Sequence, residues 1–140
     1  MSDLYDADIV QWSEYQAALL RRLAAGERVN DQVDWGNVIE EIESVGNEQV
    51  HAVSSLLMQA MAHRVKAIGW PESRDVVNWE ADARMFCAQA ADRFAPSMRG
   101  KLDLARMYRR AVRALPETTD GRSPVPAECH WTLDALLAED

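Results

Sequence analysis

Carboxylates and a histidine at helical spacing are the residues of this chain whose types could support chemistry. Glu48 and His51 have the Glu-x-x-His spacing with which helical bundles present ligands to a di-iron centre. Glu40, Glu41 and Glu43 form an acidic group shortly before them. Neighbouring carboxylates can share a proton or bind a divalent cation. The chemistry to consider first is therefore metal binding or acid–base catalysis.

Helical geometry argues against a metal site at Glu48 and His51. Counted at about 100° per residue from Trp35, both fall opposite the apolar side of their helix and should meet water. A complete di-iron site also needs a second such pair, which the sequence lacks. The upstream glutamates complement a helix dipole, and we expect Glu43, at the edge of the apolar side, to be partly buried. We predict no metal and no cofactor.

His63 and Arg64 lie toward the apolar side of the same helix. Their partners must come from another element, because Glu43 is about 30 Å away along the helix axis. This placement favours a structural histidine over a catalytic one. Cys87 lies on the apolar face of a later helix, which predicts a buried, inert thiol. The chain has no Ser/His/Asp motif, zinc spacing or glycine-rich phosphate loop.

A single long helix must position these groups. Apolar residues recur at mostly three- and four-residue steps: Trp35, Val38, Ile39, Ile42, Val45, Val50, Val53, Leu56, Leu57, Ala60, Met61 and Ile68. The pattern predicts an amphipathic helix of roughly 50 Å whose apolar face lies in the interior along its whole length. Gly46 costs such a helix about 1 kcal/mol relative to alanine. Either a neighbouring helix approaches closely there or the helix kinks.

The rest of the chain supplies partner helices. We predict helices over about 8–25, 35–69, 74–94 and 98–115, a loop over 116–130, and a short closing helix over 132–138. Asp34, Ser97 and Thr132 are the expected N-caps of three of them. The sequence therefore predicts an all-α fold: a four-helix bundle built on one long central helix, forming a single domain over 1–140.

Charge is unevenly distributed along the 140 residues. The net charge of −8 resides in residues 1–50, and residues 51–140 are neutral overall. An arginine stripe on the predicted 98–115 helix could contact phosphates: Arg99, Arg106, Arg110 and Arg113. In an acidic chain this stripe is better explained by contact with the acidic half or with a protein partner, which argues against nucleic-acid binding. No apolar run approaches a membrane span and no export leader precedes Asp3, so we expect a cytoplasmic protein.

Several motifs together resemble a known family. They are Tyr5-Asp6-x-Asp8, Trp12, Gln16-Ala17, Leu19-Leu20-Arg21, Asp34-Trp35-x-Asn37, Glu40-Glu41-Ile42-Glu43-Ser44-x-Gly46, Leu56-Leu57, Lys66, Pro71-Glu72, Pro126, Glu128-Cys129 and Thr132-Leu133. In these the chain resembles the bacterial DUF29 proteins, although His130-Trp131 replaces a proline-aromatic pair. The resemblance implies a small all-α protein of unassigned function. Its matching positions are candidates for a shared network or site: Trp35, Glu40, Glu43, His63, Arg74 and Trp79.

Three functions remain open. The favoured one is a non-enzymatic cytoplasmic module that binds a protein partner or forms a homo-oligomer, with Trp70 and Trp131 as exposed anchors. The second is a metal- or ligand-binding bundle or enzyme that uses Glu40, Glu43 and His63, with Arg74 from the next helix. The third is nucleic-acid binding through the arginine stripe.

Overall fold

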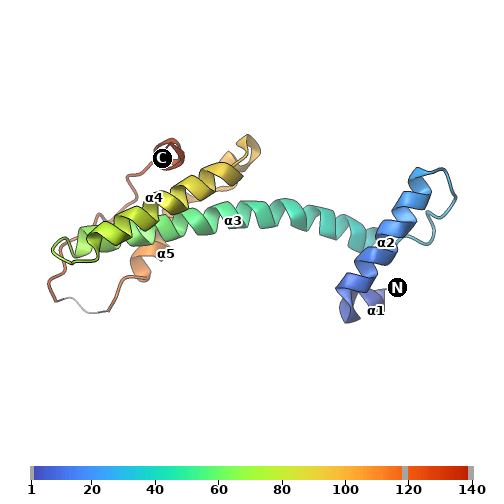
Figure 1. The fold of residues 1–140 in the computed structure, drawn as a ribbon, viewed down its shortest axis with the longest axis horizontal. Helices are drawn as coiled ribbons and strands as arrows, with labels where there is room; N and C mark the ends of the chain where they lie inside the picture. The colour runs from blue at the N-terminus through green and yellow to red at the C-terminus, as the bar shows by residue number, and fades with distance from the viewer. Residues whose placement is uncertain (1, 118–119, 139–140) are drawn as a thin grey trace. The chain divides into compact units, whose positions relative to one another are not determined.

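One helix of 35 residues, α3 (Trp35–Gly69), dominates the computed structural model of this protein (Figure 1). The structure describes residues 2–117 and 120–138, and those residues include helices, turns and loops but no strand. The all-α class and the long helix are confirmed. In the described part of the chain, no helix combines the length and apolar character that a membrane crossing requires.

The chain divides into two compact units, residues 1–47 and 48–140, where a single domain was predicted. α3 contributes its first turns to one unit and its remaining turns to the other. Each unit has its own cluster of buried apolar side chains. The long helix therefore serves two separate interiors rather than one.

The first unit consists of α1 (Ser2–Ala7), α2 (Ile9–Ala24) and the start of α3. Its buried apolar residues are Trp12, Leu19, Val29, Val33 and Val38. The sequence did not predict α1, because six residues are too few to show a helical period. α2 begins after Asp8, whose carboxylate accepts a hydrogen bond from the backbone N–H of Gln11 at 3.0 Å.

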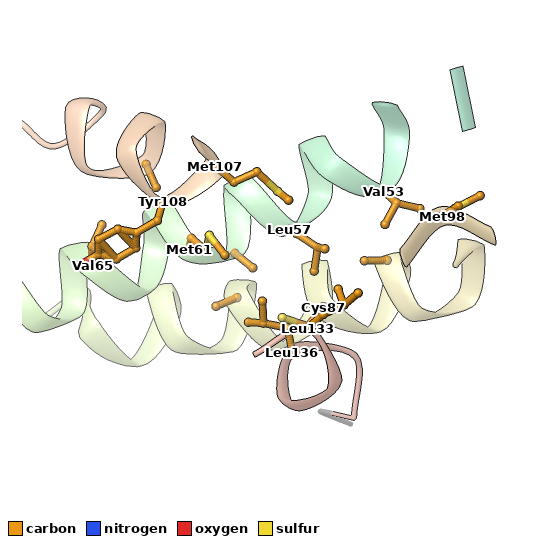
Figure 2. Close-up of a cluster of buried hydrophobic side chains, with 14 of the residues drawn as sticks. Val53, Leu57, Met61, Val65, Cys87, Met98, Met107, Tyr108, Leu133 and Leu136 are labelled. Carbon is orange, nitrogen blue, oxygen red and sulfur yellow. The ribbon is translucent and has the colours of Figure 1, made fainter. Parts of the chain in front are cut away.

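The second unit packs α4 (Val76–Arg93), α5 (Leu104–Arg113) and α6 (Leu133–Leu137) against the later turns of α3. Figure 2 shows Leu57 and Met61 of α3 lying between side chains of the other three helices. Cys87 of α4 is fully buried there, which confirms the expected buried thiol. Thr132 caps α6 as predicted, since its hydroxyl accepts from the Ala135 N–H at 3.1 Å.

The predicted helix over 98–115 is wrong in its first part. Residues Pro96–Lys101 form a 3-10 helix, η1, and Leu102 is extended. α5 starts afresh after Asp103, whose carboxylate accepts from the Arg106 N–H at 3.0 Å. The true cap is thus Asp103, not Ser97. Arg99 is separated from the arginine stripe and forms an ion pair with Asp134 at 2.7 Å.

The prediction that the apolar face of α3 is buried along its whole length is also wrong. Its first half is open: Trp35 is 43%, Ile39 51%, Ile42 68% and Val45 60% exposed. We call these four residues the open face. The helices that cover α3 in the second unit reach only its later residues, and in the first unit Val38 alone of the stripe is buried. A helical period shows that a face is apolar, not whether another element covers it.

Candidate functional site

A hydrogen-bond network joins α2 to the start of α3. The Asp34 carboxylate accepts from the Trp12 indole N–H at 3.0 Å and from the Asn37 side-chain amide at 2.8 Å. The backbone N–H of Asp34 donates to the Gln16 side-chain oxygen at 2.9 Å. The Asn37 and Trp12 donors lower the pKa of Asp34 because they stabilise its charged form. Asp34 is therefore a helix cap and an anchor for α2.

Tyr5 extends this network to α1. Its hydroxyl donates to the Glu41 carboxylate, and its ring meets the Trp12 ring edge-on, with 4.9 Å between centroids. The hydrogen bond to Glu41 raises the pKa of Tyr5 to about 12, and burial and the nearby charge of Glu40 act in the same direction. Several residues that carry the family resemblance thus tie three helices together. Their role in this unit is structural.

The predicted site residues of the first unit lie outside this network and face solvent. Trp35 is part of the open face, and its indole N–H donates to the Asn30 carbonyl at 2.7 Å. Glu40 and Glu43 are exposed. The expected partial burial of Glu43 is wrong, because no element of the first unit covers that side of α3.

His63 lies at the contact between α3 and α4. Its ring stacks on Phe86 with 5.6 Å between centroids and 8° between planes. Burial lowers the pKa of His63; the Lys66 ammonium acts in the same direction, and the Asp82 carboxylate opposes both. Its Nδ1 atom is buried without a hydrogen-bond partner in the described residues. The contact that His63 makes with another helix is therefore a ring stack on Phe86 of α4.

The six candidate positions do not form one site. Trp79 lies beside Lys66, whose ammonium is 5.9 Å from the centre of the Trp79 ring. Arg74 is exposed before α4, and about 30 Å of helix separates Glu43 from His63. Within residues 2–117 and 120–138, no three His, Cys, Asp or Glu side chains are placed to hold a metal ion.

The second unit contains a pocket that the sequence did not predict. It encloses about 350 Å³ and is lined by residues of α3, of α4 and of the segment before α6: Arg64, Ala67, Ile68, Glu80, Arg84, His130 and Trp131. The lining combines two guanidinium groups with one carboxylate, that of Glu80, beside an imidazole and an indole. The net positive charge and the rings suit a small ligand with an anionic group and an apolar part. Three segments far apart in the chain supply these residues, so no spacing pattern could reveal the pocket.

The expected tryptophan anchors are not free surface residues. Trp131 is partly buried against the apolar cluster of the second unit, and the centroid of its ring lies 5.8 Å from that of the Tyr108 ring. Trp70 is also packed on this cluster, and its indole N–H donates to the Asp120 carbonyl at 3.1 Å. Trp35, by contrast, is exposed. The exposed tryptophan is therefore at the start of α3.

Comparison with known proteins agrees with this all-helical architecture. The family model "Domain of unknown function DUF29" matches residues 4–140. A solved structure from Rhodospirillum rubrum, described as an alpha-helical protein of unknown function, is similar over 97% of this chain and 90% of its own, with 27% identity and a TM-score of 0.68. No curated protein matches the chain. The chain belongs to the DUF29 family.

Proposed function

We propose that this protein is a non-enzymatic interaction module that binds an amphipathic helix of a partner protein on its open face. The observation that carries the proposal is the exposure of Trp35, Ile39, Ile42 and Val45 at steps of four, three and three residues. Scattered exposed apolar residues are ordinary, but a continuous row marks an interaction surface. A helix face offers apolar positions to another helix at this same spacing.

Burial of the open face would contribute favourable free energy to binding. Full burial of one isoleucine or valine side chain contributes about 1.5–3 kcal/mol. Ile42 and Val45 are more than half exposed, and Ile39 is just over half exposed. Part of this gain is offset by the loss of translational and rotational freedom on association. A partner that covers all three side chains therefore gains several kilocalories per mole before that cost.

A binding role also agrees with the arrangement of the ionisable groups. Glu40 and Glu43 are exposed, His63 stacks on Phe86, and Arg74 lies apart in a turn. Catalysis by acid–base groups needs them within hydrogen-bond reach of one reacting centre. This arrangement supports an interaction role over a reaction that uses these residues.

The proposal is tested with a labelled synthetic peptide helix that carries leucines on one face and equal numbers of Lys and Glu elsewhere. Fluorescence anisotropy with the full chain should show binding that Ile42→Gln weakens roughly tenfold, since covering Ile42, which is 68% exposed, contributes about 1–2 kcal/mol. The matched control is Val77→Gln, at an exposed valine of α4. Equal affinity in the wild type and in Ile42→Gln would contradict the proposal.

A second candidate function is the binding of a small organic anion in the pocket of the second unit. The observation that favours it is the placement of Arg84 beside His130 and Trp131 in one cavity. Phenyl phosphate should shift the indole N–H resonance of Trp131 in NMR spectra, and Arg84→Gln should abolish the shift. An unchanged spectrum with phenyl phosphate would end this candidate.

We also propose a bacterial origin and a cytoplasmic location. The similar structure from Rhodospirillum rubrum supports the first. The second is supported by Cys87 and Cys129, which are both free thiols, as is usual in a reducing compartment. Fractionation of the cells that express the protein tests the location, and recovery outside the cytoplasm would contradict it.

A further inference from the structure

We infer that the partner helix is cationic and that its backbone passes closest to α3 at Gly46. This inference rests on the proposed function and names the chemistry of the partner. Two independent observations carry it. One is the charge around the open face, and the other is a glycine that the chain itself does not need.

The charged residues of the segment that carries the open face are of one sign. Residues 29–63 contain no lysine or arginine and six acidic residues. Asp34 and Glu41 are engaged within the first unit, whereas Glu40 and Glu43 are exposed. At about 100° per residue, Glu43 borders the open face next to Ile39. A helix that docks here brings its polar flanks beside these carboxylates, and positive flanks are the ones that attract them.

Gly46 lies in line with this face, one residue beyond Val45. Its helical angle falls between those of Ile39 and Ile42, by the same count of about 100° per residue. The helix continues through Gly46, and this residue is not among those with a positive φ. A Cβ added at Gly46 would meet no atom within 4 Å. Neither backbone conformation nor packing within the described chain therefore requires glycine here.

A glycine in mid-helix nevertheless costs about 1 kcal/mol relative to alanine. Close approach of another backbone is a reason for glycine that the isolated chain does not supply. The residues from Trp35 to Gly46 span about 16 Å of helix, or three turns. The partner segment is accordingly a helix of about three turns, with apolar residues on one side and lysine or arginine beside them.

A second copy of this chain fits the face less well. If two copies paired through their open faces, the Glu43 carboxylates of both copies would border the same apolar contact. Their like charges would repel each other and disfavour the pairing. The chain's own arginine-rich helix, α5, is not available as the partner. Its apolar residues Met107, Tyr108 and Ala111 are already buried in the apolar cluster of the second unit. A separate cationic helix remains as the occupant.

The charge is tested with three labelled peptides that share one leucine face and differ in their polar positions, which are all Lys, all Glu, or balanced. We expect the full chain to bind the Lys peptide at least tenfold more tightly than the Glu peptide at low salt, with a difference that shrinks as salt is added. The double variant Glu40→Lys/Glu43→Lys should remove this preference. Glu72→Lys/Glu117→Lys, at two exposed glutamates of the second unit, makes the same change in net charge and should retain it.

The close approach is tested with Gly46→Ala and Gly46→Leu. Gly46→Ala should raise the melting temperature, because alanine favours the helix. The same variant should bind the Lys peptide more weakly than the wild type, and Gly46→Leu should bind it more weakly still. Gly36→Ala is the control on the same helix, where an added Cβ also meets nothing. It should leave the affinity unchanged. Loss of affinity together with gain of stability cannot result from misfolding.

The outcomes separate this inference from the proposed function. If the Glu and Lys peptides bind equally and Ile42→Gln weakens both, the interaction module stands and the cationic partner is overturned. If Gly46→Leu binds as well as the wild type, the close approach is overturned. A dimer in sedimentation experiments that Ile42→Gln dissociates would identify a second copy as the occupant and also overturn the inference. If the balanced peptide does not respond to Ile42→Gln, the proposed function itself fails.

Discussion

Asp34→Ala should unfold the first unit selectively. The substitution removes the cap of α3, which is worth about 1 kcal/mol. It also removes the acceptor of the Trp12 indole N–H, and Trp12 is only 4% exposed. A buried donor left without a partner costs about 1–3 kcal/mol. The free energy of unfolding of the first unit should therefore fall by about 2–4 kcal/mol, a large part of the stability of a small unit.

Hydrogen exchange measured by mass spectrometry is the appropriate assay, because it reports each unit separately. Peptides from α2 should lose protection by a factor of about thirty to a thousand, the equivalent of 2–4 kcal/mol, while α4 stays protected. Asp31→Ala is the control at a neighbouring exposed aspartate. Its effect should be within about 0.5 kcal/mol. Unchanged protection of α2 in Asp34→Ala would refute the role of the network.

The same network predicts a pH dependence. Because the folded pKa of Asp34 lies below its ordinary value of 3.8, this carboxylate contributes stability above that value and loses it as the pH falls through the folded pKa. Wild-type α2 should therefore lose protection in acid, and Asp34→Ala should lose less over the same range. An equal acid response of both proteins would show that Asp34 is not the responsible group.

Two further predictions concern single ionisable groups. The Tyr5 phenol should titrate with a pKa of about 12 in NMR spectra, and Glu41→Gln should lower that pKa toward the ordinary value of 10.0; a normal pKa in the wild type would contradict the hydrogen bond. The His63 pKa should lie below 6.5, because its burial disfavours the charged ring. His63→Phe removes a buried, unpartnered Nδ1 and keeps a ring against Phe86. We therefore expect its stability in urea to be within about 1 kcal/mol of the wild type, and a much larger loss would show that the imidazole has a polar partner.

The limits of the helices are largely predictable from neighbouring residues. Asp34 caps α3, and the Gly69-Trp70-Pro71 sequence ends it, so its bounds follow from short-range steric and hydrogen-bond effects. The break before α5 was missed because Leu102 and Asp103 include no glycine or proline. There the aspartate cap decides the start of the helix, and aspartate is also common within helices.

The candidate site was less predictable than the helices. Tyr5 and Glu41 are 36 positions apart, and the pocket around Arg84 draws residues from three segments. Sequence spacing describes one helix at a time, so it cannot report which side chains of different helices meet. Some of the residues that carry the family resemblance form an internal hydrogen-bond network.

The all-α class, the length of α3 and its apolar stripe are predictable from consecutive residues, because helical period and capping are local properties. The burial of Leu57 and Met61 and the exposure of Ile39 and Ile42 depend on how the helices pack. The physical reason is that burial depends on which other elements are within reach of a face. In this chain the elements that could cover the stripe pack against its later turns, and those of the first unit bury only Val38.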